Sequence, residues 1–71
     1  MQRDELISLR KRLGIRQITV AKLANLDRST LSLWECGHVE LPEASVARIA
    51  GVLKAELDAI KNISVHQAVS A

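Results

Sequence analysis

Aromatic residues are almost absent from this 71-residue chain, which has one Trp and no Phe or Tyr. A β-sandwich core depends on aromatic and β-branched side chains, whereas helices are built well from Leu and Ala. Hydrophobic residues make up 48% of the chain, so its composition does not favour disorder. We therefore expect an all-α fold with an aliphatic core, in one domain because the chain is too short for two.

Cysteine occurs once, at Cys36, which excludes an internal disulfide and is typical of a reducing compartment. With only His38 and His66 as further soft ligands, the spacing of a zinc site is missing, so we expect no metal and no cofactor. Long apolar runs are also missing and charges interrupt the N-terminal segment, which argues against a membrane span and a signal peptide. These absences predict a cytoplasmic protein.

Catalytic constellations are missing as well. The sequence has no paired carboxylates suited to acid–base work, no nucleophile–base set and no Gly-rich phosphate loop. We therefore do not expect an enzyme.

Charge is distributed unevenly, although the net charge is only +2. Residues 1–30 carry seven Lys or Arg against three Asp or Glu, a net charge of +4, whereas residues 31–71 carry a net charge of −2. A basic half on a small domain indicates a polyanionic partner.

Apolar spacing predicts five helices, over about residues 3–13, 17–24, 28–36, 42–53 and 55–63. Gly14 and Gly37 are placed to end helices, and Asn25 tolerates the positive φ of a tight turn. The carboxylate of Asp27 is expected to cap the third helix, and Pro42 suits the first turn of the fourth. Residues 1–63 then form the domain, and residues 64–71 form a C-terminal tail that either frays or joins a dimer interface.

The most informative stretch is residues 17–37, in which two short helices meet at a tight turn. Leu31 and Trp34, three residues apart, are placed to pack inward, while Arg28 and Leu33 lie on other faces of the same helix. This arrangement lets one helix enter the major groove of DNA, about 12 Å wide, while the other rests on the phosphate backbone.

Over roughly residues 6–60 the sequence resembles the lambda-repressor/Cro-like (XRE-type) helix-turn-helix proteins. The residues that carry the resemblance are Leu9, Arg10, Lys11, Leu13, Gly14, Ile15, Gln17, Val20, Ala21, Leu23, Ala24, Leu26, Arg28, Ser29, Thr30, Leu31, Trp34, Glu35, Gly37 and Pro42. The resemblance implies a compact five-helix DNA-binding domain with its helix-turn-helix at about residues 17–36.

The resemblance implies base contacts for Arg28 and Ser29, with Ser32 and Leu33 on the same groove-facing side, a phosphate contact for Gln17, and an internal ion pair between Arg10 and Glu35. Apart from the resemblance, we expect phosphate contacts for Arg16, Thr30 and His38, and simple exposure to solvent stays open for His38. The chemistry agrees, because an arginine can donate two hydrogen bonds to a guanine and a leucine can contact the methyl group of thymine. Arg16 and Cys36 depart from the residues that are usual in the family, an N-cap Ser or Thr and a basic or amide residue.

The resemblance further implies a regulator of transcription, more specifically a repressor that binds a pseudo-palindromic operator in double-stranded DNA as a homodimer. We expect Leu57, Ile60 and Ile63 to serve both the core of each copy and the dimer interface, because a chain this short has few other apolar surfaces; a role in the core alone stays open. Two alternatives stay open: an antitoxin or accessory subunit whose main partner is a protein, such as a toxin or a polymerase, and a restriction–modification controller.

Overall fold

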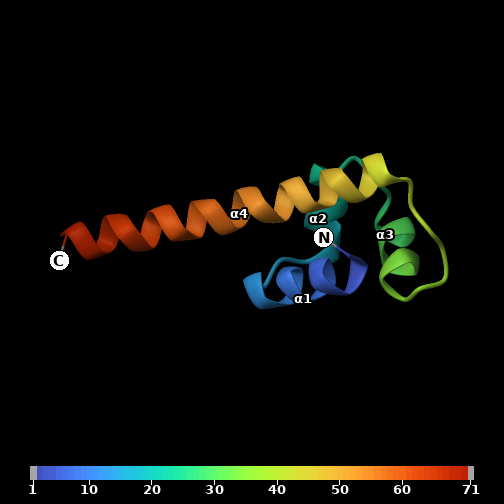
Figure 1. Ribbon diagram of the computed structural model, residues 1–71, viewed down its shortest axis with the longest axis horizontal. Coiled ribbons are helices and arrows are strands. Elements are labelled where there is room, and N and C mark those ends of the chain that lie inside the picture. Colours follow the sequence, from blue (N-terminus) through green and yellow to red (C-terminus); the bar gives the residue numbers. More distant parts are fainter. Residues whose placement is uncertain (1, 71) are drawn as a thin grey trace.

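Four helices form the protein in a computed structural model that describes residues 2–70, with side chains for residues 2–61. They are α1 (Arg3–Leu13), α2 (Gln17–Leu23), α3 (Arg28–Glu35) and α4 (Glu43–Ser70), shown in Figure 1. The described residues contain no strand, which confirms the prediction of an all-α fold. Within the same residues, no helix is long and apolar enough to cross a bilayer.

The prediction of five helices is wrong, because the segments expected as the fourth and fifth helices form the single helix α4. The expected break fell at Lys54, but Lys54 and Ala55 both favour helix, and no proline interrupts the segment. Gly51 lies within the helix and weakens it without ending it. Helix α4 also includes residues 64–70, which the sequence predicts as a C-terminal tail, and the side chains of that segment lie outside those described.

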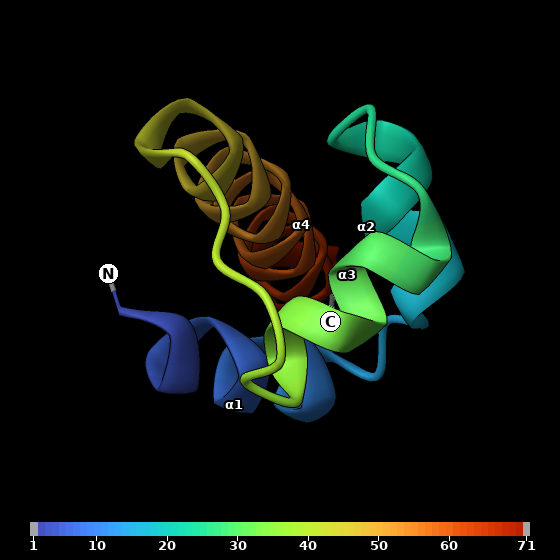
Figure 2. The same ribbon diagram turned by 90° about the vertical axis from the view of Figure 1, so that its right-hand side faces the viewer.

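The core is formed where α4 packs across α1 and α2, with α3 packed against α2 and α1. Figure 2 shows α3 at the front of the molecule and α4 leading away behind it. Trp34 is only 5% exposed, so the single aromatic residue belongs to the core, as the sequence predicted. The other buried hydrophobic residues are aliphatic: Leu6, Leu9, Val20, Ala21, Ala24, Leu31, Ile49 and Leu53.

The first three helices all end in the same way, with the chain turning through one left-handed residue. These residues are Gly14 (φ 71°), Asn25 (φ 58°) and Gly37 (φ 82°). In each case the next residue donates its backbone N–H to the carbonyl five residues earlier, at 3.1 Å for Ile15, 2.7 Å for Leu26 and 2.9 Å for His38. This pattern satisfies carbonyls that the helix leaves free and redirects the chain within two residues.

Two expected helix starts differ in detail from the prediction. Asp27 occupies the N-cap position of α3 with an extended backbone, but its side chain makes no capping hydrogen bond. Asp27 is exposed, so water can solvate its carboxylate and the amides of the first turn instead. Pro42 lies just before α4 rather than within it, and its carbonyl accepts N–H groups of Ser45 and Val46 at 3.0 and 3.1 Å.

Candidate nucleic-acid interface

Helix α3 has one buried side and one open side. Leu31 and Trp34 anchor it in the core, at 0% and 5% exposed. Arg28, Ser29 and Leu33 are exposed, with Leu33 at 45% although it is a large hydrophobic residue. The two remaining residues with an expected DNA contact on α3, Ser32 and Thr30, are half-buried. The open side is therefore mixed: a guanidinium, hydroxyls and an aliphatic side chain.

The junction between α2 and α3 is tight because small residues stand where the helices meet. Ala21 and Ala24 are 2% and 0% exposed, so both lie within the contact between the helices and the core. The backbone N–H of Leu26 reaches the Ala21 carbonyl at 2.7 Å, across the left-handed residue Asn25. These contacts fix the angle at which α3 leaves α2.

An ion pair between Arg10 of α1 and Glu35 of α3 ties the first and third helices together. Arg10 Nε lies 2.8 Å from Glu35 Oε2, and Arg10 Nη2 lies 2.9 Å from Glu35 Oε1. The two side chains are 12% and 8% exposed, so the pair is shielded from water. Arg10 Nη1 also donates to the carbonyl of Ile15 at 2.8 Å, which ties the α1–α2 turn to the same group.

Gln17 joins this cluster from the start of α2, because its Nε2 donates to Glu35 Oε1 at 3.0 Å. The carboxylate of Glu35 therefore receives donors from α1 and α2 while it sits on α3. Such a network holds the three helices in one relative position, since moving any of them breaks a charged hydrogen bond.

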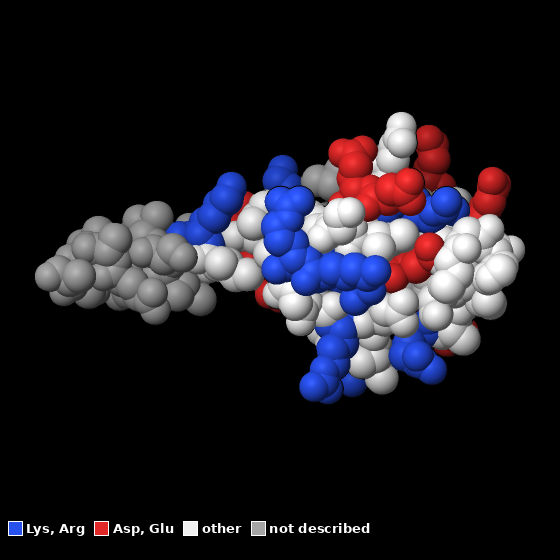
Figure 3. Space-filling view, turned by 90° about the horizontal axis from the view of Figure 1, so that it is seen from below, with Lys and Arg blue, Asp and Glu red and all other residues white. Residues whose placement is uncertain are grey.

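The residues with expected phosphate contacts lie at both ends of the α2–α3 pair. Arg16 is exposed and directly precedes α2, and Gln17 opens the helix. His38 is exposed and follows α3, beyond Gly37. In the view from below, Lys and Arg side chains extend over the middle, the lower edge and the upper left of the described surface, while most Asp and Glu side chains lie at the upper right, where Lys or Arg side chains lie beside them (Figure 3). The lower edge of this face is therefore mainly basic.

A family model described as helix-turn-helix matches residues 6–60, which is most of the chain. The chain belongs to the lambda repressor-like helix-turn-helix family. Neither the curated proteins nor the solved structures that were compared with the chain gave a match. As a member of this family, the protein is a DNA-binding protein of transcription regulation.

In this helix-turn-helix, α2 and α3 are the two short helices joined by the tight turn. Helix α3 lies at one end of the long axis, and the C-terminal end of α4 lies at the other (Figure 1).

Arg48 of α4 supports the helix-turn-helix in a way that the sequence did not indicate. Its Nε donates to the carbonyl of Ala24, at the end of α2, over 2.9 Å. Its Nη2 donates to the hydroxyl of Ser45 at 3.3 Å, and Ser45 is only 7% exposed. Arg48 thus holds the turn before α3 against α4. The contact depends on how α4 crosses α2, so no local pattern could have revealed it.

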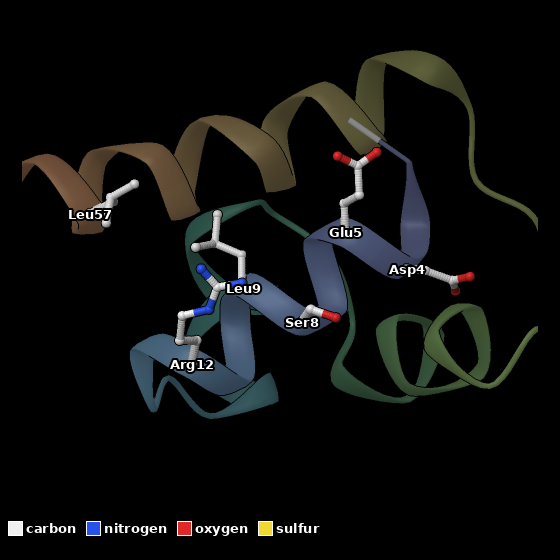
Figure 4. A pocket seen from close by; sticks show the side chains of 6 residues that line it. All are labelled: Asp4, Glu5, Ser8, Leu9, Arg12 and Leu57. Carbon is white, nitrogen blue, oxygen red and sulfur yellow. The ribbon is translucent and has the colours of Figure 1, made fainter.

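The apolar residues expected at a dimer interface lie on α4 beyond the core. Leu57 is half-buried and Ile60 is 42% exposed, whereas the side chain of Ile63 lies outside those that the structure describes. Leu57 borders an open groove of about 450 Å³ between α1 and α4 (Figure 4). The residues lining this groove are Asp4, Glu5, Ser8, Leu9, Arg12 and Leu57.

Metal ligands do not gather in the described part of the chain, where no group of three His, Cys, Asp or Glu side chains is close enough to hold an ion. Cys36 is exposed at the end of α3 with a free thiol.

Proposed function

We propose that the protein represses transcription by binding a pseudo-palindromic operator as a homodimer, with α3 of each copy in a major groove. The observation that carries the proposal is the open side of α3. Arg28, Ser29 and Leu33 are exposed on a helix whose other side is fixed in the core by Leu31 and Trp34. Repression is the simplest outcome of such binding, because a protein that occupies a promoter needs no further activity to block it.

We assign recognition of the DNA bases to four residues of α3, of which Arg28, Ser29 and Leu33 are exposed and Ser32 is half-buried. The guanidinium of Arg28 can donate two hydrogen bonds to O6 and N7 of a guanine. Leu33 can contact the methyl group of a thymine, and this contact would explain why a large hydrophobic side chain is exposed there. Ser29 and Ser32 discriminate less, because a hydroxyl both donates and accepts.

We assign the part of the DNA affinity that does not depend on base sequence to groups outside the open side of α3. Arg16 and His38 are exposed near opposite ends of the helix pair, where they can contact the two strands that border the groove. Thr30 and the Gln17 amide add neutral donors. A contact between the Arg16 guanidinium and a phosphate releases counterions, so binding should weaken with salt.

The dimer is assigned to the part of α4 that carries Leu57 and Ile60. An isoleucine 42% exposed on a long helix gains from being covered, and two copies related by a two-fold axis would cover it mutually. In such a dimer the recognition helices lie about 34 Å apart, one turn of DNA.

The test begins with selection of preferred duplexes from a random pool, followed by binding measurements on the selected and a scrambled duplex. Arg28→Ala should weaken binding to the selected duplex by about 1–3 kcal/mol and relax selectivity at one base pair. Lys54→Ala is the matched control, because it removes one charge from α4 and should leave selectivity unchanged. Equal losses on the selected and scrambled duplexes would contradict base reading by Arg28.

The dimer is tested separately by sedimentation of the free protein. We expect the parent chain to sediment as a dimer and Ile60→Glu to sediment as a monomer. Ala55→Glu adds the same charge at an exposed position about 140° around α4 from Ile60, and should stay dimeric. A parent chain that remains monomeric both alone and on the selected duplex would overturn this part of the proposal.

A further inference from the structure

The first turn of α1 lies beside the C-terminal end of α3, although more than 30 residues separate them in sequence (Figures 1 and 2). The contact is made by the guanidinium of Arg3 at Gly37, the residue that ends α3. Arg3 Nη1, Nη2 and Cζ lie 3.5, 3.7 and 3.8 Å from the point that a Cβ on Gly37 would occupy. A positive charge from α1 is thereby placed at the far end of the recognition helix.

That end of α3 receives no such charge from its own segment. Residues 36–42 contain no Lys or Arg, and they contain one acidic residue, Glu40. The opposite end is different, because Arg28 opens α3 and Arg16 precedes α2. A helix in the major groove runs between two phosphate backbones, so a cation near each end adds a charged contact to each strand.

The Arg3 side chain is available for such a contact. It is 43% exposed, and its nearest carboxylate is that of Asp4, at 3.7 Å from Nε and itself 90% exposed. Ion pairs this exposed contribute little and exchange readily with another anion. The C-terminal end of α3 carries a partial negative charge, which attracts the guanidinium and orients it before DNA is present.

We propose that Arg3 binds a DNA phosphate at the C-terminal end of α3, next to the strand assigned to His38. Arg3 and His38 then hold one strand, while Arg16 and Gln17 hold the other, so the recognition helix is fixed from both sides. The ligand is a phosphodiester group of the backbone, so the contact is the same on every sequence. The inference rests on the proposed DNA binding through α3.

Because this contact does not depend on sequence, the test needs no operator. A fluorescent duplex of mixed sequence, roughly 24 base pairs long, is titrated with the protein by anisotropy between about 50 and 200 mM NaCl. Arg3→Gln should bind several-fold more weakly at the low-salt end, and its slope of log affinity against log salt should be shallower by about 0.9. Arg12→Gln is the matched control: it removes the same charge from α1 near Leu57, away from α3, and should keep the parent slope.

A purely structural role for Arg3, as a charge at the end of α3, gives a different result. Thermal unfolding of Arg3→Gln would then shift to lower temperature while the salt slope stayed at the parent value, and that outcome overturns the inference. Arg3→Lys keeps the charge and should restore most of the slope. If the parent chain itself fails to bind the duplex at low salt, the proposed function fails. If the parent binds with a steep slope and Arg3→Gln matches it, only the assignment of Arg3 is wrong.

Discussion

Replacing Arg10 with Met tests how far the buried ion pair with Glu35 holds α3 in place. The change removes two charged hydrogen bonds to Glu35 and one to the carbonyl of Ile15. It leaves the Glu35 carboxylate, 8% exposed, with a single donor from Gln17. Breaking a buried pair from one side costs about 3–5 kcal/mol, because a charge is left without its partner. A 71-residue domain has a total stability of about 4–11 kcal/mol, so the loss is a large share of it.

The assay is urea unfolding followed by circular dichroism at a fixed protein concentration, applied to a double-mutant cycle. Arg10→Met and Glu35→Leu should each lower the free energy of unfolding by about 3–5 kcal/mol. The double variant should lose much less than the sum, because two apolar side chains of similar volume can pack where the ion pair was. Arg12→Met, on the exposed side of α1, should change stability by less than about 0.5 kcal/mol. Losses below about 1 kcal/mol for both single variants, or strictly additive losses, would refute the reasoning.

Two further predictions concern the turn and the recognition helix. Asn25→Ala should lower the free energy of unfolding by about 1–2 kcal/mol in the same urea assay, because the left-handed backbone at φ 58° is unfavourable for alanine. Asn25→Gly should lower it far less. Equal effects of the two changes would contradict this explanation. Cys36, the single cysteine, is exposed at the end of α3. It lies seven residues, or about two helical turns, after Ser29 and therefore on the same side of the helix. A duplex that binds α3 should therefore slow maleimide labelling of the Cys36 thiol, and an unchanged rate at saturating DNA would show that DNA lies elsewhere.

The features that the sequence predicted well are those with local causes. A core without Phe or Tyr favours helices, and the structure is all-α. Gly14, Asn25 and Gly37 were placed at helix ends because they accept a positive φ, and all three have one. The inward positions of Leu31 and Trp34 follow from their spacing, and both are buried.

The features that the sequence did not predict depend on how helices meet or on where a helix stops. The join between the expected fourth and fifth helices had no strong stop signal, and Lys54 and Ala55 let α4 continue through it. The contact of Arg48 with Ala24 needs α4 to cross the end of α2, and the approach of Arg3 to Gly37 needs α1 to lie beside the end of α3. Asp27 has the residue type and position of an N-cap, yet its carboxylate makes no capping bond.

The shortness of the two paired helices has a consequence for regulation. With seven residues in α2 and eight in α3, neither is long enough to persist alone in water, where about 12–15 residues are needed. The surface formed by α2 and α3 therefore exists only while the whole domain is folded, so DNA binding and unfolding compete for the protein. Bound DNA adds RT ln(1 + [DNA]/Kd) to stability, about 2.7 kcal/mol at a hundredfold excess over Kd. Under the proposed function, variants that are too unstable to stay folded in free solution remain folded on their DNA site, and a modest rise in temperature lowers the occupancy of that site by unfolding the unbound protein.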